Sequence, residues 1–138
     1  MAEMFHLDIV TPEKSILSCN VQEIVAPGTS GEFGVLSGHT PFLTILKIGH
    51  LWAKTQEGNI HMAVSGGFAE ITGDKVIILA ETAERAEDIN VEETKAMLEM
   101  AYDKLKSIPK EDPDFKKWDK KVRIAEVKLS VAEKAKTV

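Results

Sequence analysis

The chain has 138 residues, of which 43% are hydrophobic and 28% are charged, and its net charge is −5. This length is enough for one domain or for a small domain plus an appendage, and the composition fits a globular protein rather than a disordered one. The apolar runs are too short to span a bilayer, the N-terminus lacks the pattern of a secretory signal, and Cys19 has no second cysteine to pair with. We therefore expect an intracellular protein without direct membrane insertion, which reaches a membrane only through a partner.

Residues 4–80 consist of short apolar runs of alternating polarity, separated by glycine and proline. The runs cover residues 5–10, 21–26, 31–36, 42–48, 49–54, 60–64, 68–71 and 76–79. Many short strands without a helix-length segment between them predict an antiparallel sandwich or barrel. We expect Cys19 in a turn between the first two strands, as a small half-buried side chain rather than a nucleophile.

The run over residues 42–48 is apolar on both faces. In a two-layer sandwich one face of a strand meets water, so a second apolar face needs a cover. One interpretation is a docking surface for another protein or a patch beneath a helical arm. The other is a central strand that the domain covers on both sides. The sequence leaves both interpretations open.

The hydrophobic period changes near residue 88, from two to the three-and-four spacing of a helix. The first helical stripe contains Val91, Thr94, Leu98, Ala101, Leu105 and Ile108. The second contains Phe115, Trp118, Val122, Ala125, Leu129 and Ala132. We therefore predict a β-domain over residues 1–87 and an antiparallel helical hairpin over 88–138.

Capping residues predict the ends of the two helices. Asn90 followed by Glu93 is an N-cap with a capping-box partner, and Pro109 ends the first helix near Ile108. Asp112 followed by proline starts the second helix. The seam between the helices is narrow and rich in alanine, so we expect a hairpin that is metastable unless it docks on another surface.

Charge is divided unevenly along the chain. Residues 114–138 hold eight basic and four acidic residues, a net charge of +4, and the remainder has a net charge of −9. The acidic body argues against binding of nucleic acid. The basic final helix indicates either an acidic partner surface or a solvated lysine-rich face.

The residues that carry chemistry form no recognisable catalytic or metal motif. The four histidines (His6, His39, His50, His61) have no ligand spacing, and the glycines near residue 31 are not followed by a phosphate-loop lysine. Ser65 lacks the preceding glycine of a nucleophile elbow. We predict no catalytic residue, no metal and a solvated acidic linker containing Glu81, Glu84, Glu87 and Asp88.

Four segments resemble, in order, motifs of the epsilon subunit of the bacterial F-type ATP synthase. Residues 31–42 (GEFGVLSGHTPF) resemble its G-E-L-G-I-x-P-G-H-x-P-L signature, with Ser37 where the family usually has proline. Residues 7–12 resemble its first strand, 65–71 its S-G-G-x-x-E-V stretch, and 79–89 the segment that leads into its C-terminal arm.

The resemblance implies a ten-stranded antiparallel β-sandwich followed by a two-helix hairpin. It implies a non-catalytic central-stalk subunit that rotates with the gamma subunit and the c-ring and couples proton flow to ATP synthesis. The implied c-ring-facing loop contains Gly31, Glu32 and Phe33. The implied gamma-docking residues are His39, Phe42, Leu43, Ile45, Leu46 and Ile48.

In this family the arm either folds on the sandwich or extends into the catalytic head, where it blocks ATP hydrolysis. The resemblance implies that basic residues of the arm face an acidic loop of the catalytic beta subunit in the alpha/beta head. These residues are Lys116, Lys117, Lys120, Lys121, Arg123 and Lys128. The implied location is peripheral, on the cytoplasmic side of the bacterial cell membrane.

Some family members bind a regulatory ATP through an I-D-x-x-R-A motif. The aligned residues are Ile89, Asn90, Glu93 and Thr94, and only the isoleucine matches. Glu93 places negative charge where a phosphate would lie. We therefore expect weak or absent ATP binding and no other cofactor.

Two other kinds of protein fit the pattern of strands and helices. One is a small β-sandwich enzyme, although the sequence shows no cluster of acidic, basic or metal-binding residues that would serve as its active site. The other is a free-standing β-sandwich adaptor protein with a coiled-coil arm. Copurification with a membrane ATPase distinguishes both from a rotor subunit.

Overall fold

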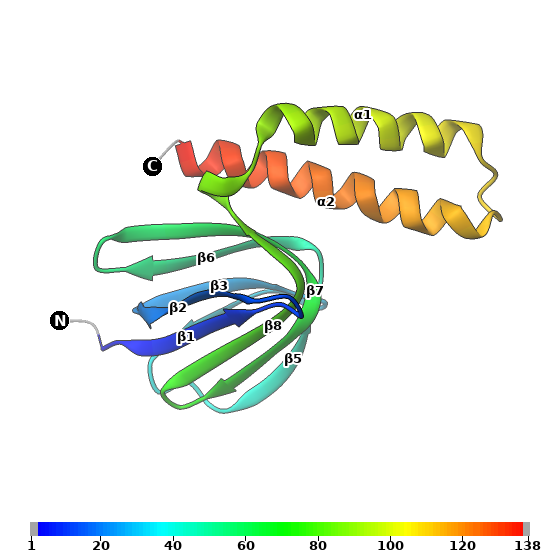
Figure 1. The fold of residues 1–138 in the computed structure, drawn as a ribbon. Helices are drawn as coiled ribbons and strands as arrows, with labels where there is room; N and C mark the ends of the chain where they lie inside the picture. The colour runs from blue at the N-terminus through cyan, green and yellow to red at the C-terminus, as the bar shows by residue number, and fades with distance from the viewer. Residues whose placement is uncertain (1–2, 137–138) are drawn as a thin grey trace.

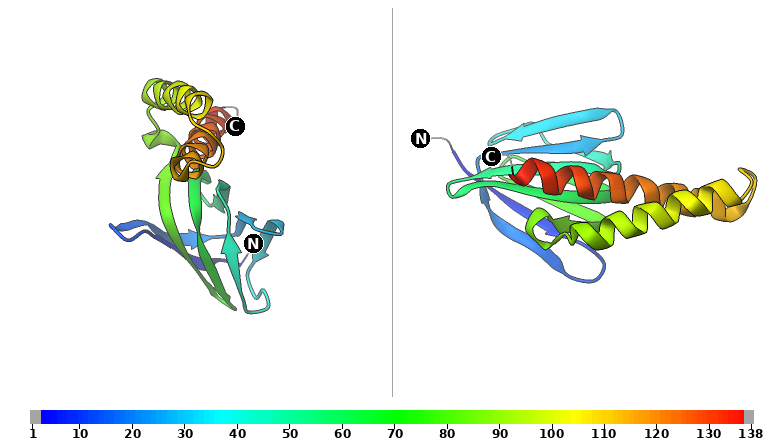
Figure 2. Two further views of the ribbon diagram at one scale, coloured as in Figure 1. Left: turned by 90° about the vertical axis from the view of Figure 1, so that its right-hand side faces the viewer. Right: turned by 90° about the horizontal axis from the view of Figure 1, so that it is seen from above.

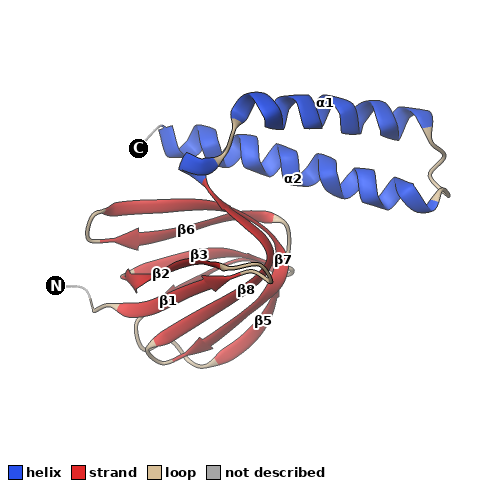
Figure 3. Ribbon diagram, viewed as in Figure 1, coloured by secondary structure: helices blue, strands red, loops and turns tan. Residues whose placement is uncertain are grey.

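The computed structural model describes residues 3–136 and divides them into a β-domain and a helical arm (Figure 1). The strands of the β-domain are β1 (Phe5–Val10), β2 (Ser15–Val21), β3 (Glu23–Gly28), β4 (Gly31–Leu36), β5 (Phe42–Leu46), β6 (Gly49–Thr55), β7 (Gly58–Thr72) and β8 (Lys75–Arg85). A short 3₁₀ turn, η1 (Ala86–Asp88), leads to α1 (Val91–Ser107) and α2 (Pro113–Lys136). Figure 3 separates the two parts by secondary structure.

The eight strands form one curved, mixed sheet in the order β2-β1-β8-β7-β5-β3-β4, with β6 joined to β3 and β7. The predictions of ten strands and of purely antiparallel pairing are therefore wrong. Strands β1 and β8 pair in parallel, with Leu7 opposite Val76. A parallel pair needs a long crossover connection. Here the crossover is the rest of the domain, because the pair joins its first strand to its last.

The two strands predicted over residues 60–64 and 68–71 are parts of a single strand, β7. β7 continues through Gly66 and Gly67, whose φ angles of 70° and 114° only glycine adopts readily. A side chain on Gly67 would clash with the backbone of Leu79 and Ala80 on β8. The glycine pair therefore bends β7 without ending it and lets β8 approach closely.

Two further expectations are corrected by the strand boundaries. Cys19 lies within β2, opposite Leu7 of β1, and not in a turn. β8 extends to Arg85, so Glu81 and Glu84 project from a strand and not from a linker. Polar residues in β2 and in the second half of β8 break the apolar alternation, which hides both segments from a periodicity search.

The core of the β-domain fills the interior of the curved sheet. Its largest fully buried side chains are Leu7, Ile9, Ile24, Leu51, Met62, Ile71 and Ile78. Each buried side chain of this size stabilises the fold by roughly 1.5–3 kcal/mol. This core therefore holds the β-domain together.

The arm is an antiparallel helical hairpin with the predicted ends. The Glu93 N–H donates to Asn90 Oδ1 (3.0 Å), which caps α1. The Asp114 N–H donates to Asp112 Oδ1 (2.8 Å) at the start of α2. The predicted stripes face each other, with Ala101, Val122 and Ala125 buried between the helices. The middle of the predicted seam is thus confirmed, but Val91 and Ala132 of the predicted stripes pack in the cluster on the β-domain, because the arm rests on β7 at this end.

A second apolar face of α2 packs the arm onto the β-domain. Val131 and Ala132 of α2 form a small buried cluster with Ala63 of β7 and Ile89. Seen from above, the arm crosses the β-domain, and the loop between the helices projects beyond it (Figure 2). Only part of the arm therefore touches the β-domain.

Candidate functional site

An exposed apolar patch lies on the outer face of the sheet. Ile45 of β5, Phe68 of β7 and Leu79 of β8 pair in one row across three strands. These side chains are 55%, 50% and 51% exposed, and Leu43 beside them is 67% exposed. We call Leu43, Ile45, Phe68 and Leu79 the apolar patch. An exposed group of this kind is typical of a protein-docking surface.

The apolar patch excludes the interpretation of residues 42–48 as a strand that the domain covers on both sides, and it also excludes a cover by the arm. Leu43 and Ile45 face solvent, whereas Leu46 is buried and Phe42 packs against the core. The arm packs instead around Ala63, on the other half of β7. Neither the domain interior nor the docked arm covers the outer face of β5.

The other two residues expected to bind gamma lie at the ends of β5. His39 precedes the strand, with its ring centroid 5.1 Å from that of Phe42. Ile48 follows it and lines a cavity beneath α2, away from the patch. Phe68 and Leu79 were missed in the sequence, because only the strand register places them beside Ile45.

The residues of the expected ring-facing loop lie at the start of β4. The turn itself is Thr29-Ser30, and Gly31 pairs with Gly28 across it. Gly31 and Glu32 are exposed, whereas Phe33 is half-buried and packs edge-on against Phe42 at 5.6 Å between ring centroids. The phenyl ring thus supports the hairpin from β5, and the carboxylate of Glu32 remains in solvent.

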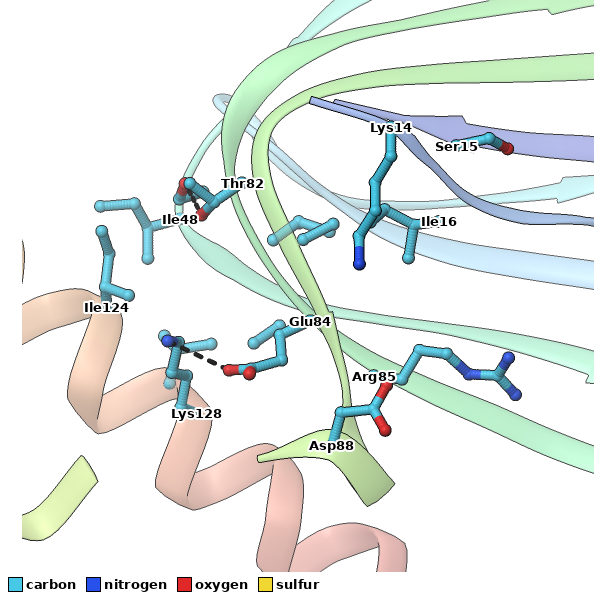
Figure 4. Close-up of a pocket in the computed structure, with 15 residues that line it drawn as sticks. Lys14, Ser15, Ile16, Ile48, Thr82, Glu84, Arg85, Asp88, Ile124 and Lys128 are labelled. Carbon is cyan, nitrogen blue, oxygen red and sulfur yellow. Dashed lines mark hydrogen bonds and ion pairs between the residues drawn. The ribbon is translucent and has the colours of Figure 1, made fainter. Parts of the chain in front are cut away.

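Of the six basic residues of the arm that were predicted to face the beta subunit, two form ion pairs with the β-domain. Lys120 Nζ lies 2.8 Å from a Glu81 carboxylate oxygen, and Lys128 Nζ lies 3.1 Å from one of Glu84. Figure 4 shows the second pair. Two of the four acidic residues predicted to be solvated, Glu81 and Glu84, are therefore partners of the arm, whereas Glu87 pairs with Arg85 of β8.

The other four predicted basic residues remain on the arm surface. Arg123 pairs with Asp119 of the same helix at 3.4 Å. Lys117 and Lys121 each hold their ammonium group 5.6 Å from the centroid of the Trp118 ring. Lys116 is exposed. The docked arm therefore keeps a basic outer surface.

A cavity of about 590 Å³ separates part of α2 from the β-domain. Its labelled lining residues in Figure 4 include Lys14, Ile16, Ile48, Thr82, Glu84, Asp88, Ile124 and Lys128. The Arg85 side chain points away from it (Figure 4). The cavity shows that the arm is loosely packed here, since a tight interface leaves few voids larger than water.

The residues aligned with the regulatory ATP motif border a second cavity, of about 370 Å³, between the two helices and β8. Asn90, Glu93 and Thr94 line it, but Ile89 is buried in the cluster beneath the arm. The Asn90 side chain already caps α1, and Thr94 Oγ1 donates to the Asn90 carbonyl oxygen at 2.7 Å.

The charges of this second cavity do not favour a polyphosphate. Its acidic residues are Glu84, Asp88 and Glu93, and its basic residues are Lys121 and Lys128. Lys128 is already paired with Glu84. The carboxylates are therefore not fully compensated, and repulsion would weaken the binding of phosphate groups.

Two histidines of the β6–β7 hairpin meet beneath the arm. His50 Nε2 lies 2.8 Å from His61 Nδ1, and the rings stack at 5.0 Å between centroids. Burial, the nearby His61 and Lys134 lower the pKa of His50 to about 4. Among residues 3–136, no third histidine, cysteine or carboxylate joins this pair to form a group that could bind a metal ion.

The fold and these surfaces define a class of protein: a small β-sandwich protein that exposes an apolar patch and carries a folded helical arm. Among the helices formed by the described residues, none has the length and apolarity required to cross a membrane.

Comparison with known families agrees with this class. Residues 4–86 match the family described as the beta-sandwich domain of the ATP synthase delta/epsilon chain. The ATP synthase epsilon chains of Geotalea uraniireducens and Geobacter sulfurreducens are each 47% identical over 135 residues, which is 98% of this chain and 98% of theirs. The chain belongs to the ATP synthase epsilon-chain family.

Solved structures show the same fold. A chain in the Euglena gracilis mitochondrial ATP synthase, determined as OSCP, F1 and c-ring, has a TM-score of 0.77 and 25% identity. The match covers 98% of this chain and 82% of that one. A chain of the central stalk and c-ring of the Tetrahymena thermophila enzyme has a TM-score of 0.55 at 15% identity, which shows a shared fold alone.

Proposed function

We propose that this protein is a non-catalytic central-stalk subunit of a rotary ATP synthase, peripheral to the cytoplasmic face of a bacterial membrane. It turns with the gamma subunit and the c-ring and so helps to couple proton flow to ATP synthesis. The observation that carries the proposal is the apolar patch on a chain of this family, because four large side chains remain in water unless a partner covers them.

The apolar patch binds the gamma subunit. It lies on three paired strands, which hold its side chains in a fixed arrangement, and β7 and β8 extend it beyond the β5 residues expected from the sequence. Glu32 lies on the separate β3–β4 hairpin and contacts the c-ring. The two attachments therefore use different parts of the β-domain.

Copurification of the assembled complex tests both attachments. Leu43→Asp with Ile45→Asp should reduce recovery of the protein with gamma by about tenfold or more, because two buried charges would replace apolar contacts. Leu36→Asp is the matched control, since Leu36 is an equally exposed leucine outside the patch, at 59%. Phe42 is unsuitable, because it packs against the core and its substitution would also destabilise the domain.

A charge reversal at Glu32 separates the second attachment from the first. Glu32→Lys should weaken recovery with the c-ring while the isolated gamma subunit still binds. Normal recovery of both partners by the patch variant and by the Glu32 variant would refute these surface assignments.

The arm inhibits ATP hydrolysis when it leaves the β-domain and extends into the alpha/beta head. Lys120 and Lys128 support this proposal, because the docked arm pairs them with Glu81 and Glu84. The same two lysines cannot bind an acidic surface of the head at the same time. Docking and inhibition therefore compete, and removal of residues 90–138 should raise hydrolysis while leaving assembly intact.

A further inference from the structure

The His50–His61 contact depends on the protonation of both rings. A ring nitrogen of one must donate while the nitrogen of the other accepts, at a separation of 2.8 Å. If both rings are protonated, neither of these nitrogens can accept, and two positive charges lie within contact distance. The contact therefore requires that at least one ring is neutral.

The arm covers this pair when it is docked. His50 pairs across the sheet with Ala63, which packs against Val131 and Ala132 of α2. His61 borders a cavity with Ala132 of α2, and its Nε2 atom is buried without a hydrogen-bond partner among the described residues. Docking thus removes water from His50, and burial is the main cause that lowers the pKa of this ring.

The surrounding charges oppose protonation further. On α2, Lys134 lies close enough to lower the pKa of His50, and Lys136 borders the cavity of His61. Of the acidic groups on the elements around the pair, Glu87 of η1 pairs with Arg85 and Glu84 of β8 pairs with Lys128. Asp88 of η1 and Glu133 of α2 remain as acidic groups without such a pair among the described residues. The arm therefore brings positive charge to the pair.

We propose that the His50–His61 pair is a pH-sensitive latch, on which the arm docks while the pair is neutral and from which protonation releases it. The latch deepens the proposed function, because it regulates the arm that inhibits hydrolysis. It links acidification of the surrounding solution to release of the inhibitory arm.

The direction of the pH dependence follows from the lowered pKa of His50. The pKa of His50 is about 4 while the arm is docked, and release of the arm raises this pKa toward the ordinary value of 6.5, because His50 regains water and Lys134 moves away. Docking is therefore fully favoured above pH 6.5 and weakens as the pH falls toward 4. At pH 5.5 the docking equilibrium falls by at most about tenfold, because the β-domain itself supplies part of the burial.

Thiol labelling beneath the arm measures this equilibrium on the full chain. A cysteine placed by Ala63→Cys, in a Cys19→Ser background, becomes reactive only when the arm lifts. Its labelling rate is divided by the rate in the urea-unfolded chain at the same pH, which cancels the ionisation of the thiol. We expect this ratio to rise several-fold between pH 7.5 and 5.5.

Substitutions test whether the His50–His61 pair causes this rise in the labelling ratio. His50→Gln with His61→Gln should hold the ratio within twofold over this range, whereas His39→Gln, which changes a histidine of the β4–β5 connection, should keep the rise. Lys134→Gln should reduce the rise, because the pKa of His50 in the docked state moves back toward its ordinary value. This last variant decides the matter if the double variant does not fold.

A flat ratio in the unmodified pair, or an unchanged rise in the double variant or in Lys134→Gln, would overturn the latch. These outcomes are distinct from a failure of the proposed function. The labelling uses the isolated full chain, whereas inhibition is measured as hydrolysis by the assembled complex.

Discussion

The β-domain and the arm are held by interfaces of very different strength. The β-domain encloses large side chains such as Leu51, Met62 and Ile78. The arm is attached through a small cluster that is half alanine and through two partly exposed ion pairs, and a partly open cavity lies beside these contacts. A buried Leu or Ile side chain stabilises a fold by roughly 1.5–3 kcal/mol, whereas the single methyl group of a buried alanine contributes about 0.8 kcal/mol. The arm can therefore detach while the β-domain stays folded.

The strongest test of this contrast is a change that breaks the β-domain itself. Gly67→Ala should lower the free energy of unfolding by about 2–4 kcal/mol, because the methyl group meets the backbone of β8 and the φ angle suits glycine. Urea unfolding followed by Trp52 fluorescence measures the effect, in a Trp118→Phe background that removes the signal of the arm.

Two other glycines separate the clash from the backbone strain. Gly58 has a φ angle of 125° and Gly73 has no positive φ, and a methyl group at either would meet open space. Gly58→Ala should cost about 1 kcal/mol and Gly73→Ala almost nothing. Equal losses at all three positions would show that β8 does not press against Gly67.

A smaller effect is expected from the ion pairs of the arm. Lys120→Gln with Lys128→Gln should weaken docking by about 1 kcal/mol in total, since partly exposed pairs contribute 0–1 kcal/mol each. The β-domain should keep its stability. Thiol labelling at position 63 measures docking, and the urea transition of Trp52 measures the β-domain.

Lys116→Gln is the matched control for the ion pairs, because Lys116 is exposed on the same helix. It should leave docking unchanged. A loss of β-domain stability in the double variant, or an equal effect of Lys116→Gln, would contradict the separation of the two interfaces.

The smallest effect is expected from nucleotide. Isothermal calorimetry of the full chain with ATP should detect no binding at micromolar concentration, because the cavity between the helices carries more acidic than basic residues. Glu93→Arg should improve binding by supplying a cation for phosphate. Tight binding by the unmodified chain would show that the arm has a regulatory nucleotide site, contrary to this prediction.

The features that could be predicted from sequence are local ones. Asn90 and Asp112 cap their helices through residues two or three positions away, and the interhelical stripe repeats within each helix. These interactions act within a few residues, so the sequence displays them directly.

The features that were missed depend on which residues of paired strands lie opposite each other. The parallel β1–β8 pair, the extension of the patch to Phe68 and Leu79, and the contact of His50 with His61 all follow from strand register. The spacing of residues along the chain does not determine strand register. The resemblance to a family therefore predicted the fold class, but it did not predict which of these side chains lie side by side.

The central claim is that the arm alternates between docking on the β-domain and inhibiting hydrolysis. A covalent clamp tests it most directly. Glu81→Cys and Lys120→Cys, in a Cys19→Ser background, replace a pair whose charged atoms lie 2.8 Å apart. A short bifunctional thiol reagent would then hold the arm on the β-domain in the assembled complex, with each single-cysteine chain as a control.

Hydrolysis of ATP by the clamped complex is the decisive measurement. We predict that the clamp raises the rate to that of a complex lacking residues 90–138, by about fivefold or more, as is usual for coupling between distant sites. The single-cysteine controls should stay inhibited. A clamped complex that remains as inhibited as the controls, while the truncated complex is activated, would contradict the account.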